Sequence, residues 1–255
     1  MFRRWWSVRL VSGATPDRLP GQRRMTREQQ ETVLQEWQIM RSRLGAFAAE
    51  RVAEAGDVLR IAELDLRPAA AGRDSVLGAV QRDYTWALEA YQAAGKLLDE
   101  AADLPDLAAS VVLAERAVER LAAAHARHAG RRPKPAVARC FYNPLHGAAA
   151  RPTAAGVPAK RKRARVSPRQ AAADRRPACE SCRLAILAGQ RPDVLPALLA
   201  VRTSWRRTVR VLVPYYAVPQ QRSPWSVTAC GAYGDEGPAL VMRGEHRRGG
   251  VAADH

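Results

Sequence analysis

Two stretches of helically spaced apolar residues, separated by a very short connection, constrain the fold more than any other feature of the sequence. The first repeats at intervals of three and four over three heptads, through Leu77, Val80, Tyr84, Ala87, Tyr91, Ala94, Leu98 and Ala101. The second repeats at intervals of four and three, through Leu107, Val111, Ala114, Val118 and Leu121. The turn Asp103–Asp106 between them contains Pro105, which the first turn of a helix tolerates. Helices joined by so short a turn pack antiparallel, so the sequence predicts an αα-hairpin.

A third helix is predicted before this hairpin. Thr26 and Gln29 are spaced as a capping box, in which each side chain accepts a hydrogen bond from the other residue's backbone. The apolar residues that follow are spaced by four, three, four and three and line one helix face, at Val33, Trp37, Met40, Leu44 and Phe47. We expect a break at Gly56-Asp57 and an end before Pro68. The fold class predicted is mainly α, with residues 26–130 forming a three-helix antiparallel bundle that has coiled-coil spacing.

The basic charge of the chain is concentrated outside this bundle. The 255 residues carry a formal charge of +16, and residues 131–176 hold thirteen basic residues against one acidic residue. Residues 148–177 are almost entirely Ala, Arg, Lys, Pro and Gly. Such a composition cannot bury enough apolar area to offset a backbone entropy of about 1–2 kcal/mol per residue. We therefore expect residues 1–25 to be a disordered basic arm and residues 148–177 to be a disordered insertion.

The C-terminal part of the sequence has little regular pattern. Alternation of apolar residues from Val209 to Tyr215 predicts one strand. Prolines and glycines then interrupt the chain at Pro219, Pro224, Gly231, Gly234 and Gly237. We expect residues 196–255 to be a poorly ordered tail.

Four residues that flank the predicted insertion have the spacing of metal ligands. Cys140, His146, Cys179 and Cys182 form the pattern Cys-x5-His-x32-Cys-x2-Cys. Structural zinc sites hold the ion with four tetrahedral thiolate and imidazole ligands. The Cys-x2-Cys spacing lets two thiolates converge from one turn, and the apolar run Leu184–Leu187 predicts a helix behind them, whose N-terminal dipole favours thiolates. The sequence thus predicts a Cys3His zinc knuckle within residues 131–195.

Other interpretations of the cysteines stay open. In one alternative, Cys140 is a small buried hydrophobic residue and Cys179 and Cys182 are close in sequence by chance. In another, the cysteines belong to a disulfide framework. A redox pair would need a βαβ context, which the sequence around Cys179 does not show. A catalytic zinc would need an open coordination position and a general base, and Glu180 is the one carboxylate close to these residues in the sequence. Cys230 is predicted to be a spare thiol. Because no nucleophile arrangement or phosphate-binding loop can be assembled from spacing, we expect no enzymatic activity.

The basic run Lys160, Arg161, Lys162 and Arg163 suggests a second function. A flexible polycation binds phosphates by counterion release, with little sequence preference. No aromatic residue is interleaved in the run to stack on bases, and no nucleic-acid-binding fold accompanies it. An accessory nucleic-acid-binding role for residues 131–176 is therefore the alternative to a non-catalytic interaction or scaffold role with a protein partner.

The segment Cys140–Gly147, followed by Ala178–Cys182 and Gly189–Asp193, resembles the C-terminal region of actinobacterial TPM-domain membrane proteins. The tail Val213–Gln221 is similar too, and the resemblance covers about residues 75–245. The resemblance implies that this chain is a cytoplasmic module at the periphery of a membrane. In that family, other segments provide the membrane association. The sequence shows neither the extracytoplasmic domain of that family nor its transmembrane helix, so no activity of that domain is carried over. No stretch reaches the roughly 18 apolar residues that span a bilayer, and no signal peptide is visible.

Overall fold

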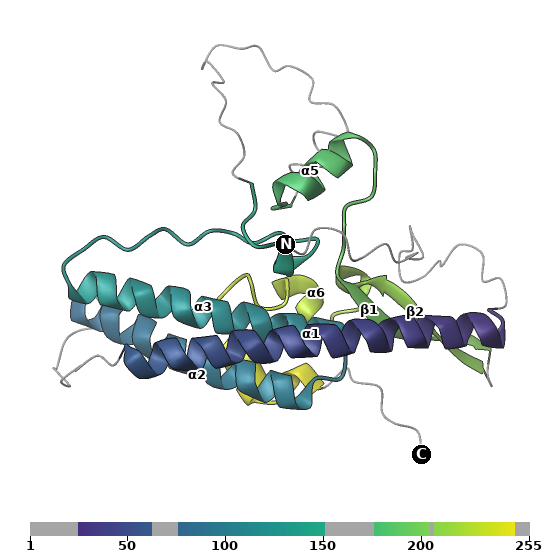
Figure 1. The fold of residues 1–255 in the computed structure, drawn as a ribbon, viewed down its shortest axis with the longest axis horizontal. Helices are drawn as coiled ribbons and strands as arrows, with labels where there is room; N and C mark the ends of the chain where they lie inside the picture. Colours follow the sequence, from purple (N-terminus) through teal and green to yellow (C-terminus); the bar gives the residue numbers. More distant parts are fainter. Residues whose placement is uncertain (1–24, 63–75, 151–175, 205–206, 248–255) are drawn as a thin grey trace, which may run out of the picture. The chain divides into compact units, whose positions relative to one another are not determined.

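The structure, a computed structural model, describes residues 25–62, 76–150, 176–204 and 207–247 (Figure 1). These residues divide into two compact units. The smaller unit comprises residues 137–150 and 176–195, and the larger unit comprises all other described residues. The four predicted metal ligands therefore belong to one unit, and the predicted helical bundle belongs to the other.

Three long helices form the bulk of the larger unit. They are α1 (Arg27–Ile61), α2 (Val76–Glu100) and α3 (Leu104–His128). Near the start of α3, Trp37 Nε1 donates a hydrogen bond to Asp103, and near its end His125 Nε2 lies 3.0 Å from the carbonyl oxygen of Ala62. The helix α1 therefore runs parallel to α3 and antiparallel to α2, and the three lie side by side in Figure 1. The predicted αα-hairpin and three-helix antiparallel bundle are confirmed.

Local sequence signals set the ends of these helices. The capping box of Thr26 and Gln29 is present at the start of α1. Asp103 caps α3 in the same way with Asp106, and Pro105 occupies the first turn. Alanines line the interface between α2 and α3 and allow close approach, and Ser110 Oγ donates a hydrogen bond to the carbonyl oxygen of Ala94 across it.

The predicted break at Gly56-Asp57 is wrong, because α1 continues without interruption to Ile61. A Cβ atom on Gly56 would lie 2.6 Å from Tyr91 Oη of α2, so the glycine provides room for the tyrosine. Gly56 is buried at this contact. Gly56 therefore allows the two helices to pack closely at Tyr91. The gain from this packing outweighs the poor helix propensity of glycine.

Replacing Gly56 by alanine should destabilise the larger unit by about 1–3 kcal/mol, because the new methyl group overlaps Tyr91. In an uncrowded helix the same change stabilises by about 1 kcal/mol. Gly95→Ala in α2 is the matched control, because a Cβ there meets no atom within 4 Å. Urea unfolding followed by circular dichroism measures both variants. Equal stabilisation by the two substitutions would contradict the packing role of Gly56.

The prediction of a poorly ordered tail is wrong for residues 196–204 and 207–247. Strands β1 (Pro196–Ser204) and β2 (Arg207–Pro214) form an antiparallel hairpin, in which Leu198 pairs with Leu212. The predicted strand at Val209–Tyr215 corresponds to β2. Short helices follow the hairpin: η2 (Tyr215–Ala217), α6 (Trp225–Thr228), α7 (Gly237–Met242) and η3 (Glu245–Arg247).

Long-range anchors explain the order of this region. Trp225 is 1% exposed, and its Nε1 donates a 2.7 Å hydrogen bond to the Asp106 carboxylate. The backbone N–H of Leu198 donates to Asp103, which lies beside Asp106 at the start of α3. At the edge of β2, the Gln30 side-chain amide bonds both the N–H and the carbonyl oxygen of Arg210. These contacts join residues that are distant in sequence. The prediction of disorder used only the local frequency of proline and glycine, which carries no information about such contacts.

The smaller unit contains two short helices and a few backbone contacts. The helices are η1 (Pro144–His146) and α5 (Glu180–Leu187). The N–H of Phe141 donates to Pro177 O, and the N–H of Ala150 donates to Ala178 O. The boundaries predicted for the insertion, 148–177, are therefore too wide, because both of its ends belong to this unit. Its central part, residues 151–175, lies outside the described residues.

Two further predictions concern segments that the structure does not describe. The basic arm lies almost wholly within residues 1–24, and the run Lys160–Arg163 lies within residues 151–175. Both therefore remain predictions. Among the described residues, no helix is both long enough and apolar enough to cross a membrane.

Candidate metal centre

The first pair of predicted ligands comes from a closed turn. Asn143 caps η1, because its side-chain oxygen accepts a hydrogen bond from the N–H of Leu145. Gly147 then adopts a positive φ of 77°, a conformation that glycine allows without strain. The chain turns back so that the N–H of Cys140 donates to Gly147 O at 3.0 Å. The long Cys-x5-His spacing is thus closed by backbone contacts, and His146 faces the side of the turn on which Cys140 lies.

The second pair comes from the start of α5. Cys179 occupies the N-cap position and Cys182 lies in the first turn of the helix, which begins at Glu180. The predicted helix behind the Cys-x2-Cys pair is therefore present. Because the N-terminal end of a helix carries partial positive charge, this position favours thiolates.

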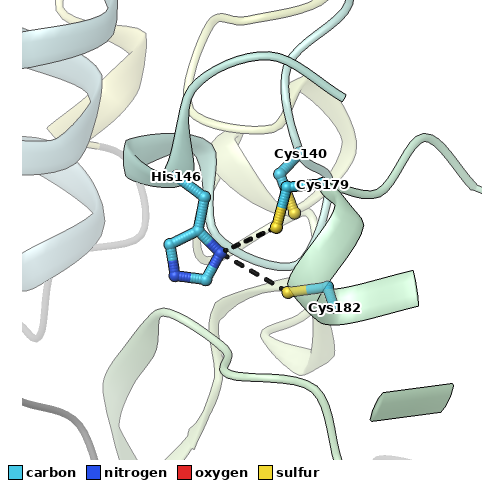
Figure 2. Close-up of side chains that lie close together, drawn as sticks. All are labelled: Cys140, His146, Cys179 and Cys182. Atoms are coloured by element: carbon cyan, nitrogen blue, oxygen red, sulfur yellow. Dashed lines mark hydrogen bonds between the residues drawn. The ribbon is translucent and has the colours of Figure 1, made fainter. Parts of the chain in front are cut away.

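The four donor atoms converge on one point (Figure 2). The Nδ1 atom of His146 lies 3.4 Å from Cys179 Sγ and 3.4 Å from Cys182 Sγ. With Cys140 Sγ, the donors lie within 4.8 Å of one another. Zinc bonds of about 2.3 Å to sulfur and about 2.0–2.1 Å to nitrogen separate tetrahedral N and S ligands by about 3.5 Å and two sulfurs by about 3.8 Å. The cluster therefore has the dimensions of a four-coordinate metal site, and its residues lie close enough to bind a metal ion.

The electrostatics of the cluster favour positive charge at its centre. Burial alone would lower the pKa of His146, but hydrogen bonds with Asp193, Cys140 and Cys179 outweigh it and raise that pKa to about 11. Hydrogen bonds from the neighbouring thiols Cys140 and Cys182 hold the pKa of Cys179 well below its ordinary value, against the effect of burial. Hydrogen bonding with Cys140 and Cys179, together with burial, raises the pKa of Cys182. These opposed shifts reflect how closely the donor atoms are held together.

Asp193 is a site residue that sequence reasoning missed. Its Oδ2 atom lies 3.1 Å from His146 Nε2, the ring nitrogen on the far side from the sulfurs. The expectation that Glu180 is the one carboxylate near the ligands is therefore wrong. Asp193 follows Cys182 by eleven residues, and this spacing is not part of a metal-binding motif that would have predicted its place at the site. The backbone returns there because the N–H of Leu195 donates to Tyr142 O.

Three of the candidate ligands also belong to a hydrophobic cluster of the smaller unit. Its buried members are Cys140, Ala178, Cys179 and Cys182, and Tyr142 packs against them. Three of the four buried members are candidate metal ligands. The packing of this cluster therefore depends on the same side chains that would hold an ion.

None of the four cysteines of the chain forms a disulfide. Cys230 lies in the larger unit, fully buried, and burial raises the pKa of its thiol. It is not among the four clustered residues. The structure thus separates three clustered thiols from one isolated thiol.

Comparisons with protein-family models, with curated proteins and with solved structures find no match to this chain. The resemblance to the TPM-domain proteins is not tested by them. The interpretation of the site accordingly depends on its geometry and on the chemistry of its donors.

Proposed function

We propose that this protein is a non-catalytic interaction module whose smaller unit is built around one structural zinc ion. The observation that carries the proposal is the convergence of three sulfurs and one imidazole nitrogen within 4.8 Å of one another. Two of the N–S separations are 3.4 Å, near the edge length of a zinc tetrahedron. Soft thiolate ligands favour zinc over magnesium, calcium and manganese, which prefer oxygen ligands.

A structural role is favoured over a catalytic one for two reasons. Four protein ligands complete a tetrahedral zinc site, whereas catalytic zinc sites keep one position for water or substrate. The nearby carboxylate, Asp193, lies on the far ring nitrogen of His146 and so is badly placed to act on a metal-bound water. Three of the ligands are also at most 7% exposed, which limits access of a substrate to the ion.

The purified protein should contain one zinc ion per chain, measured by elemental analysis. Replacing zinc with Co2+ should produce the intense visible absorption of tetrahedral thiolate coordination. Cys182→Ser should abolish stoichiometric zinc binding because it removes one donor. Cys230→Ala is the matched control, since that thiol lies outside the cluster and its loss should leave the zinc content at one. Metal-free protein, with the three clustered thiols reactive toward a thiol reagent, would refute the proposal.

The nucleic-acid alternative has a distinct test. Retention on DNA that falls when residues 151–175 are deleted, and that is unchanged by zinc removal, would favour that alternative. Such retention should decline steeply with salt, as counterion release requires. The protein partner, the cytoplasmic location and the membrane association that the resemblance implies stay predictions.

A further inference from the structure

The imidazole of His146 has different neighbours on its two nitrogens. Nδ1 faces the sulfurs of Cys179 and Cys182 (Figure 2). Nε2 lies 3.1 Å from Asp193 Oδ2 and 3.2 Å from Asn143 Nδ2. Only Nδ1 is therefore placed to bind an ion held by the sulfurs, and binding requires that Nδ1 carry no proton.

The two neighbours of Nε2 favour opposite tautomers. The side-chain oxygen of Asn143 accepts from the N–H of Leu145, so its NH2 group faces the ring and can only donate. An NH2 donor pairs with an Nε2 that lacks a proton, which places the proton on Nδ1 and blocks the metal. A carboxylate only accepts, so Asp193 pairs with Nε2–H and leaves the lone pair of Nδ1 available.

We propose that Asp193 is the positioning residue that selects the metal-binding tautomer of His146 and orients its ring toward the ion, an inference that rests on the proposed zinc site. Metal-bound histidines commonly donate their second N–H to a carboxylate, which fixes the ring and strengthens the ligand. The segment that holds Asp193 is itself fixed, because the N–H of Leu195 donates to Tyr142 O. Asp193 remains 40% exposed at its side chain, so its removal leaves no buried cavity.

Zinc affinity and histidine tautomer together test the role of Asp193. In the zinc-loaded full chain labelled with 15N-histidine, NMR should show His146 in the Nε2–H tautomer with Nδ1 bound to zinc. Competition with a chromophoric chelator should show that Asp193→Ala weakens zinc binding by about 10–100-fold. Asp193→Asn, whose side-chain oxygen accepts the same hydrogen bond without the charge, should recover part of this loss.

Glu180→Gln is the charge-matched control. Glu180 is an exposed acid in the first turn of α5, next to Cys179, and its replacement removes the same charge without removing the acceptor at Nε2. It should change zinc affinity by less than about twofold. A zinc-loaded wild type with the proton on Nδ1, or an Asp193→Ala variant that binds zinc as tightly as the wild type, would overturn the inference while leaving the zinc site intact. A wild type that binds no zinc would instead defeat the proposed function, and this inference with it.

Discussion

Removing zinc from the intact protein should unfold the smaller unit and leave the larger unit folded. Structural zinc contributes about 10–16 kcal/mol of apparent binding free energy in small zinc-finger peptides, which matches or exceeds the whole stability of many domains. Here three of the four buried residues of one hydrophobic cluster in the smaller unit are candidate ligands. Loss of the ion would therefore leave three sulfurs and an imidazole close together without a metal ion between them. The buried residues of α2 and α3 belong to the larger unit.

Hydrogen exchange, measured by NMR before and after chelation, resolves the two units. The N–H groups of Cys140, Phe141 and Ala150 donate the backbone bonds that close the smaller unit, and their protection should be lost. The amides in the middle of α3 should keep theirs. Re-addition of zinc, as a control for irreversible damage, should restore the protection. Protection at Cys140 that survives complete metal loss would show that the smaller unit folds without its ion.

Asp106→Ala should destabilise the larger unit by about 2–4 kcal/mol. The carboxylate accepts hydrogen bonds from the N–H groups of Ala102 and Asp103 and from Trp225 Nε1, at 3.0, 3.0 and 2.7 Å. An alanine leaves the buried Trp225 Nε1 without an acceptor, which costs about 1–3 kcal/mol, and it removes the capping hydrogen bonds of the exposed Ala102 and the half-buried Asp103, whose loss costs about 0.5–2 kcal/mol. The adjacent Asp103 is also desolvated: burial raises its pKa to about 6, despite hydrogen bonds to that carboxylate from Trp37, Leu104 and Leu198.

Urea unfolding of the variants measures this cost. Asp99→Ala is the control, because Asp99 is an exposed carboxylate near the same turn and its loss should change stability by less than about 0.5 kcal/mol. Trp225→Phe should cost less than Asp106→Ala, since it removes one of the three donors and keeps most of the buried ring. Similar midpoints for Asp106→Ala and Asp99→Ala would show that the buried carboxylate is not an anchor.

The helical part of the fold was predictable because its signals are local. The capping box at Thr26 and the position of Pro105 each act within a few residues, and both are present. The apolar spacing of three and four residues likewise predicted the two helices of the hairpin. The continuity of α1 at Gly56 was not predictable, since it depends on Tyr91, a residue of another helix. The order of residues 196–247 was missed for the same reason, because Trp225 gains its partner from Asp106, more than a hundred residues earlier.

The candidate site was predictable in its ligands and not in its surroundings. Cysteine and histidine spacing identified the four donors, since few other functions require thiols and imidazole in that pattern. Spacing carries no information about a hydrogen-bond partner such as Asp193, whose place depends on how the chain returns after α5. The closure of the turn between Cys140 and Gly147 likewise follows from backbone geometry that ligand counting does not show.

The pairing of Ala150 with Ala178 has a consequence for how this chain can vary. Residues 150 and 178 are joined by one backbone hydrogen bond beside the ligand cluster. The chain between them therefore starts and ends at nearly the same point. The entropic cost of closing a flexible loop grows only by about 0.6 kcal/mol for each doubling of its length. Relatives with much shorter or longer stretches at this point could therefore keep the same fold, and a reporter sequence inserted there would be tolerated at little energetic cost.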